Sequence, residues 1–136
     1  MLRLRLPQAL KTFLLICAGG AAGTGARYLV VTASARWLGP VFPFGTLTVN
    51  LVGSFLLGVI MKLGLDYGAL SPDVRVVLAT GVMGGFTTYS SFNYEVVGYF
   101  QRGAWLLGTV YVSATVVGCF VAGMLGVASA RWMVGA

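Results

Sequence analysis

Four long apolar stretches divide the chain, and each is as long as a membrane-spanning helix. A transmembrane helix needs about 20 mostly apolar residues. The first stretch is longer than the apolar core of a signal peptide, which has about 7 to 15 residues, so we predict a span there as well. The predicted spans cover residues 12–35, 45–65, 74–99 and 103–130. They predict an all-α membrane protein with a single four-helix domain over residues 1–136.

Prolines, a capping sequence and tryptophans mark the ends of these spans. Pro40 and Pro43 would disrupt a helix interior, so the second span is expected to begin near Gly45. Ser71-Pro72-Asp73 favours a helix start before the third span. Trp105 and Trp132 lie near the ends of the fourth span and are typical of aromatic anchors at the membrane surface.

The third span is irregular, because glycine, hydroxyl and aromatic residues crowd its centre. Residues 81–92 read GVMGGFTTYSSF. Adjacent glycines weaken a helix, and nearby hydroxyls can satisfy the backbone groups that a break exposes. We therefore predict a helix broken in mid-membrane, where such breaks commonly line ion sites. The alternative is a kinked helix whose serines and threonines only bond to neighbouring helices.

The second and fourth spans carry weakly polar residues at four-residue spacing, which places them on one face of each helix. A buried amide must find hydrogen-bond partners, so Asn50 either joins helices or offers its N–H donors to a passing solute. The two polar faces together predict a path through the protein. The residues are Thr46, Asn50, Ser54 and Gly58 in the second span and Tyr111, Thr115 and Cys119 in the fourth.

Two of the charged residues in or beside the spans are candidates for a role in the site. Arg27 is inside the first span, where an arginine costs from about 2.5 kcal/mol upward, so it needs a partner or an aqueous vestibule. Glu95 follows Phe92 by three residues towards the end of the third span. Glu95 is expected either to pair with Arg27 or to anchor the helix at the membrane surface.

The composition supports a membrane protein and excludes an enzyme. The chain is 58% hydrophobic and 9% charged, against roughly 25% charged residues in soluble domains. Its 20 glycines predict close helix packing. Metal and acid–base chemistry need clusters of His, Cys, Asp or Glu, whereas this chain has no His, two Cys and three acidic residues. The net charge of +6 is assigned to loops beside the membrane and not to a nucleic-acid surface.

The basic residues at and beyond the ends of the spans are unevenly shared between the two predicted sides. The positive-inside rule therefore favours both termini in the cytoplasm. One side carries Arg3, Arg5, Lys11, Lys62, Arg75 and Arg131, and the other carries Arg36 and Arg102.

The polar faces supply hydroxyl and amide donors, and aromatic ring edges carry partial positive charge. Such groups can replace the water around a small anion. The residues alone leave fluoride, chloride and a neutral solute as open alternatives.

Three motifs, in order along the chain, resemble those of the Fluc/CrcB family of bacterial fluoride channels. They are GGAAGTGARY at residues 19–28, GTLTVNLVG at 45–53 and GGFTTYSSF at 84–92. The resemblance implies a passive channel of the bacterial inner membrane that exports fluoride and so lowers its cytoplasmic concentration. It also implies two subunits packed in opposite orientations, a dual-topology dimer with two pores. A central structural sodium ion would be held by the backbone carbonyls of Gly84 and Thr87 of both subunits.

The resemblance also implies the residues of the pore. Arg27 matches the arginine of the family's first span, and with Glu95 it is assigned to a vestibule or a structural role. Tyr89 stands where the family usually has phenylalanine, and Cys119 stands where a hydroxyl would better continue the polar face. The implied pore residues are Asn50, Tyr89, Ser90, Ser91, Phe92, Tyr111 and Thr115.

Three alternatives follow from the same residues. The uneven basic residues suggest one fixed orientation, in which case the chain would form a heterodimer with an oppositely oriented relative. A small four-helix proton-coupled antiporter shares the size and span count, but it needs a buried carboxylate. A membrane scaffold without transport would use the glycines and hydroxyls only for packing.

Overall fold

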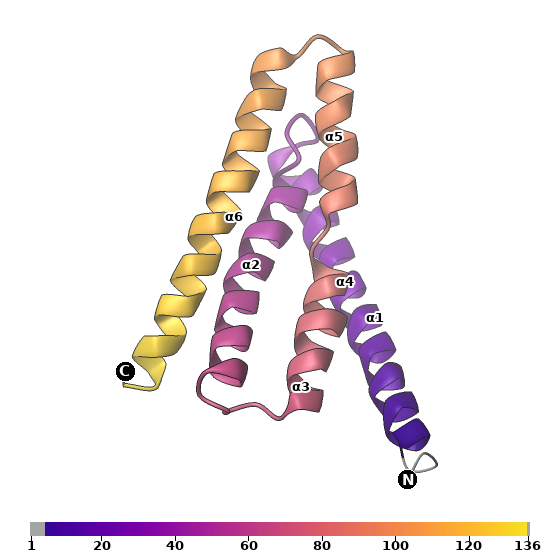
Figure 1. Cartoon of the computed structure of the whole chain (residues 1–136). Helices are drawn as coiled ribbons and strands as arrows, with labels where there is room; N and C mark the ends of the chain where they lie inside the picture. Colours follow the sequence, from indigo (N-terminus) through magenta and orange to yellow (C-terminus); the bar gives the residue numbers. More distant parts are fainter. Residues whose placement is uncertain (1–4, 136) are drawn as a thin grey trace.

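The computed structural model describes residues 5–135, and the side chains of residues 7–135. Within this range every regular element is helical (Figure 1). Arg3, which enters the count of basic residues, lies outside the described residues, and so does the side chain of Arg5. The long helices are α1 (Arg5–Leu38), α2 (Phe44–Leu65) and α6 (Trp105–Met133).

The segment predicted as the third span is a row of shorter helical pieces. Three helices in the described residues are long and apolar enough to cross a membrane, over Pro7–Leu38, Phe44–Leu65 and Trp105–Met133. The third segment is instead divided into four pieces. They are α3 (Pro72–Val76), the π-helix η2 (Val77–Met83), α4 (Gly84–Phe86) and α5 (Tyr89–Gln101).

The observed ends differ from the predicted ones by a few residues, except in α1. That helix extends beyond the predicted span at both ends and runs to Leu38, shortly before the two prolines. The last helix begins at Trp105 and not at Gly103, because Gly103 has a positive φ of 73° and forms the turn between α5 and α6.

The break in the third segment lies at two threonines. Thr87 (φ −84°, ψ 161°) and Thr88 (φ −154°, ψ 114°) have extended backbones between α4 and α5. Gly84 and Gly85, to which the break was attributed from sequence, are helical. A side chain on Gly85 would clash with the carbonyl oxygen of Gly20 in α1, whereas one on Gly84 would meet nothing within 4 Å. Gly85 therefore permits close packing against α1, and the break begins after the glycine pair.

Glycines also bring the other helices together, as the composition predicts. A methyl group on Gly126 of α6 would clash with the carbonyl oxygen of Phe55 in α2. The same change at Gly23 of α1 would clash with the carbonyl oxygen of Val82 in η2. Backbones that approach this closely leave no room for a side chain, so these helix pairs depend on glycine.

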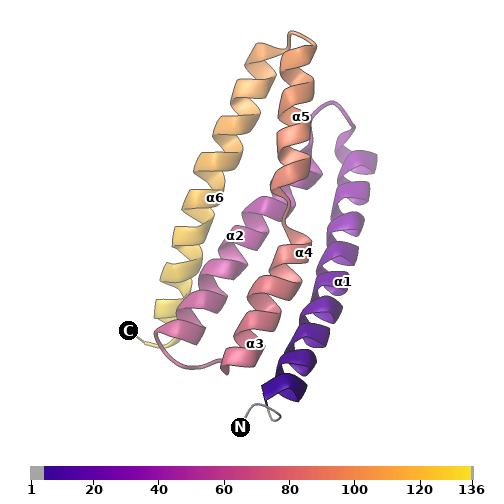
Figure 2. The same cartoon turned by 45° about the vertical axis from the view of Figure 1, so that its right-hand side comes forward.

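The elements form a narrow bundle whose two ends carry different connections. Two views show the α2–α3 loop at the same end as the two ends of the described chain, with the α5–α6 turn at the opposite end (Figures 1 and 2). This arrangement agrees with the predicted grouping of the basic residues. A cluster of buried side chains joins α5 to α6 and consists of Phe92, Val96, Tyr99 and Tyr111.

Candidate functional site

Asn50 of α2 bonds to both backbone groups of Thr88 at the helix break. Its amide Nδ2 donates to the Thr88 carbonyl oxygen at 3.0 Å, and the Thr88 N–H donates to its Oδ1 at 2.8 Å. In a continuous helix the Thr88 N–H would bond to the carbonyl of Gly84, four residues earlier. The side chain of Asn50 thus replaces helical hydrogen bonds. Of the two predicted roles for Asn50, joining helices is confirmed.

Thr88 is the residue that sequence reasoning missed. It is buried, and its Oγ1 accepts a hydrogen bond from the backbone N–H of Ser91 at 3.2 Å, which caps the start of α5. Threonine is a favoured N-cap residue, so this local signal was present in the sequence. What the sequence did not contain was the pairing of Thr88 with Asn50, which are 38 positions apart.

The break also exposes carbonyl groups, and α1 supplies donors to two of them. The guanidinium of Arg27 donates to the Thr87 carbonyl oxygen at 3.2 Å. The Thr24 hydroxyl donates to the Gly85 carbonyl oxygen at 3.5 Å. Gly84, whose carbonyl loses its usual donor, is exposed. The predicted need of Arg27 for a partner is confirmed.

The carboxylate of Glu95 does not pair with Arg27 but bonds to hydroxyl groups of two other helices. Its Oε1 accepts a hydrogen bond from the Thr46 hydroxyl at 2.8 Å, and its Oε2 accepts one from the Tyr111 hydroxyl at 2.7 Å. The predicted pairing of Glu95 with Arg27 is wrong, because α5 turns the carboxylate inward between α2 and α6. The contacts agree with the structural role that the resemblance implies for Glu95. The carboxylate thus joins three helices at half-buried depth.

Aromatic rings continue this polar layer. Phe92 lies against Tyr111 with ring centroids 5.1 Å apart and planes at 71°, an edge-to-face contact. Tyr89 lies 5.8 Å from Phe92. Phe92 is buried, whereas Tyr89 is 77% exposed on the surface of the single chain.

A hollow of about 310 Å³ lies beside the break and gathers several of the predicted site residues. Thr115 is one of its lining residues, and its buried hydroxyl has no hydrogen-bond partner among the described residues. A buried polar group without a partner is costly and calls for a ligand or water. The lining residues are Asn50, Ser54, Leu57, Thr87, Thr88, Tyr89, Phe92, Thr115, Val116 and Cys119.

Hollows of about 370 and 190 Å³ lie on the other side of the aromatic layer, and Glu95 lines both. Tyr111 is fully buried, with its ring against Phe92 and its hydroxyl on Glu95. Through these contacts it connects Phe92, which lines the 310 Å³ hollow, to Glu95, which lines the other two.

Several predicted site residues line none of these hollows, namely Arg27, Gly84, Ser90, Ser91 and Tyr111. Of these, Ser90 and Ser91 are exposed. Their hydroxyl oxygens lie 3.4 and 3.0 Å from Oγ1 of Thr88. The geometry thus connects them to the helix cap at the break.

The chemistry of the site is that of hydrogen-bond donors and ring edges. Asn50 and Thr115 contribute an amide and a hydroxyl, and Phe92 and Tyr89 contribute aromatic rings. Within the described residues there is no group of three or more His, Cys, Asp or Glu side chains that could hold a metal ion. Such a site can surround a small solute with donors.

Comparison with known proteins gives a consistent result. A family model described as CrcB-like protein, Camphor Resistance (CrcB), matches residues 14–127. A protein of Anaeromyxobacter sp. (strain K) named Fluoride-specific ion channel FluC is 52% identical over 122 residues, which cover 90% of this chain and 97% of that protein. A protein of the same name from Sorangium cellulosum (strain So ce56) is 48% identical over 85% of this chain and 91% of its own length.

The relatives also test two predictions made from the residues. They are named as ion channels and not as enzymes, which confirms that an enzyme was rightly excluded. The channel name and the long apolar helices indicate a membrane protein. Because the family model covers most of the chain and similar proteins match it over nearly their whole length, the chain belongs to the CrcB-like family.

Proposed function

We propose that this chain is a subunit of a bacterial inner-membrane channel through which fluoride leaves the cytoplasm down its gradient. The names of the similar proteins support this function. The structural observation that carries it is Thr115, a lining residue of the 310 Å³ hollow whose buried hydroxyl has no partner in the described residues.

Fluoride is a demanding solute, because a small anion holds its water strongly. A pore that conducts it must replace that water with donors. Asn50 donates one N–H to Thr88, and its amide carries a second N–H. The Thr115 hydroxyl and the ring edges of Phe92 and Tyr89 add to the donors around the hollow. Tyr111 continues the track beyond Phe92.

The site favours passive flow over coupling to protons. A proton-coupled antiporter needs a carboxylate that is free to bind and release a proton during transport. Glu95 has hydrogen-bond donors on both carboxylate oxygens, from Thr46 and Tyr111. These contacts assign Glu95 to holding the helices and the pore layer together.

The proposal includes a second subunit in the opposite orientation and a structural sodium ion between the two. The residues present fit such an ion, since unwound backbone carbonyls commonly bind sodium in membrane proteins. Gly84 is exposed beside the break, and its carbonyl has lost its helical donor. The Thr87 carbonyl accepts one hydrogen bond from Arg27, which leaves its second lone pair free. Each chain would supply these two oxygens, and the ion would hold the two breaks together.

The partner subunit is proposed to be a second copy of this chain, with an oppositely oriented relative as the alternative. Either partner would cover Tyr89, which is 77% exposed in the single chain. A scaffold without transport would explain the close glycine packing, but it gives no reason for an unpartnered buried hydroxyl beside a hollow.

The test is fluoride efflux from liposomes that contain the purified protein, followed with a fluoride electrode. Potassium chloride in place of fluoride is the control for leak. We expect fluoride efflux alone, and its loss in Phe92→Ile, because the branched chain removes the ring edge. Size-exclusion chromatography of both proteins shows whether the variant assembles as the wild type does. No fluoride efflux from well-folded wild-type protein would overturn the channel and favour a missing partner or a scaffold.

A further inference from the structure

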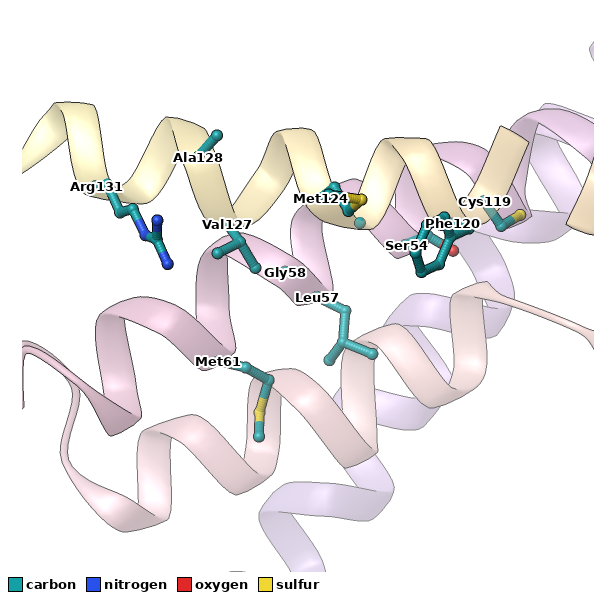
Figure 3. Close-up of a pocket in the computed structure, with 11 residues that line it drawn as sticks. Ser54, Leu57, Gly58, Met61, Cys119, Phe120, Met124, Val127, Ala128 and Arg131 are labelled. Atoms are coloured by element: carbon teal, nitrogen blue, oxygen red, sulfur yellow. The ribbon is translucent and has the colours of Figure 1, made fainter. Parts of the chain in front are cut away.

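A larger hollow continues from the candidate site towards the C-terminal end of α6. It has a volume of about 640 Å³ and lies between α2 and α6 (Figure 3). Ser54, Leu57 and Cys119 line both this hollow and the 310 Å³ hollow that holds Thr115. The two hollows therefore adjoin one another. We call the larger one the α2–α6 groove.

Arg131 is the one charged residue that lines either of these two adjoining hollows in the described part of the chain. Figure 3 shows its side chain extending from α6 into the space beside α2. The rest of the groove is mainly apolar, with Leu57, Phe120 and Val127 among its lining residues. Arg131 is exposed, near the outer end of the groove.

Two other basic side chains at this end of the bundle, Lys62 and Arg75, are already engaged. Lys62 forms an ion pair with Asp66. The guanidinium of Arg75 donates to the Gly64 carbonyl oxygen at 3.3 Å. For Arg131, no side-chain hydrogen bond or ion pair is found within residues 7–135. Its charge is therefore the one directed into the groove.

We propose that the α2–α6 groove is one mouth of the ion path, and that Arg131 gathers anions there. This inference rests on the proposed function. A cleft with apolar walls focuses the field of a charge within it and raises the local concentration of the opposite ion. The apolar walls offer an anion few binding groups, so it moves on towards Thr115 and Asn50.

The test separates collection of anions from structural support. Initial fluoride efflux is measured in liposomes of neutral lipid, over a range of fluoride concentrations and at low and high concentrations of an impermeant salt. The variants are Arg131→Gln, Arg131→Lys and Arg131→Glu. Lys62→Gln is the matched control, because it removes one positive charge at the same end of the bundle but outside the residues that line the groove.

We expect Arg131→Gln to lower efflux about two- to fivefold at low salt and low fluoride. A change of this size corresponds to the loss of one unit charge that attracts an anion from about 10 Å. The difference should vanish at saturating fluoride or at about 1 M salt, where charges are screened beyond about 3 Å. Arg131→Lys should retain most of the rate, Arg131→Glu should be slower than Arg131→Gln, and Lys62→Gln should match the wild type.

Four results would overturn the inference. If Arg131→Gln equals the wild type at low salt, Arg131 does not gather anions. A loss that is the same at all fluoride and salt concentrations would mean a structural role, including a groove filled by a lipid chain. An equal loss in Lys62→Gln would mean a general effect of surface charge. If folded wild-type protein passes no fluoride at all, the proposed function falls with the inference, and the wild-type arm alone reveals this.

Discussion

At the scale of a single residue, the side chain of Asn50 supplies hydrogen bonds that the backbone lacks at the break between α4 and α5. Its amide meets the N–H and the carbonyl of Thr88, and both contacts are buried. A buried backbone group that loses its partner costs about 1–3 kcal/mol. Thr115 is the opposite case, since its buried hydroxyl has no partner in the described residues. The two residues thus predict opposite effects on stability.

Asn50→Ala is expected to destabilise the protein by about 2–4 kcal/mol, because two backbone groups of Thr88 lose their partners. The loss of stability is measured as a fall in melting temperature in detergent, with size-exclusion chromatography as the readout of unfolding. Asn93→Ala is the control, since Asn93 is an exposed asparagine on α5. Equal melting temperatures for the two variants would show that the Asn50 contacts do not hold the break.

Thr115→Val is expected to leave stability unchanged or to raise it by up to about 1 kcal/mol, because it removes a hydroxyl without a partner and keeps the shape of the side chain. Fluoride efflux from liposomes is expected to fall at least tenfold, since a donor beside the path is lost. A variant that is stable and conducts like the wild type would contradict the role given to Thr115. Thr115→Ser, which keeps the hydroxyl, should retain most of the flux.

At the scale of elements, the broken segment is held from two sides. From one side, α2 bonds to the break through Asn50. From the other, α1 supplies Arg27 to the carbonyl of Thr87 and packs its glycines against η2 and α4. The short pieces of the third segment therefore depend on the long helices for their positions.

Gly23→Ala is expected to destabilise the protein by about 1–3 kcal/mol, because the added methyl group would clash with the carbonyl of Val82 and push α1 away from η2. Gly25→Ala is the matched control on the same helix, since a methyl group there meets nothing within 4 Å. That control should be neutral or gain up to about 1 kcal/mol from helix propensity. Melting temperatures in detergent compare the two, and similar losses in both would refute close packing at Gly23.

At the scale of the whole molecule, the single chain leaves aromatic and apolar side chains at the break uncovered. Tyr89 is 77% exposed although it contacts the buried ring of Phe92. Gly84 is exposed beside it. A second subunit against this face would cover both residues, which is why the proposal includes a dimer.

Reporter fusions at the carboxyl terminus test the orientation of the subunits. A dimer of two oppositely oriented copies should give signal from a cytoplasmic reporter and, in a separate fusion, from a periplasmic one. The unequal shares of Lys and Arg in the loops argue for one orientation, so the outcome is informative. Signal from one side alone would exclude the homodimer and support a heterodimer with an oppositely oriented relative.

Local signals in the sequence were enough to predict the helical segments and the presence of a break, because length, hydropathy, proline and glycine act within one segment. They also indicated which residue types would gather, as Asn50, Tyr89, Phe92 and Thr115 do around one hollow. The position of the break could not be predicted in this way. It depends on an amide that meets Thr88 from another helix.

The hydrogen-bond partners of charged and polar groups likewise could not be predicted from the sequence. An ion pair between Arg27 and Glu95 was one of the alternatives, but packing brings Arg27 to a carbonyl at the break and Glu95 to two hydroxyls. Periodicity assigns a residue to a face of its own helix, whereas the choice of partner depends on how the helices cross and rotate. The sequence thus determined the apolar helices and the kind of chemistry they carry, and only the tertiary structure determined which donor meets which acceptor.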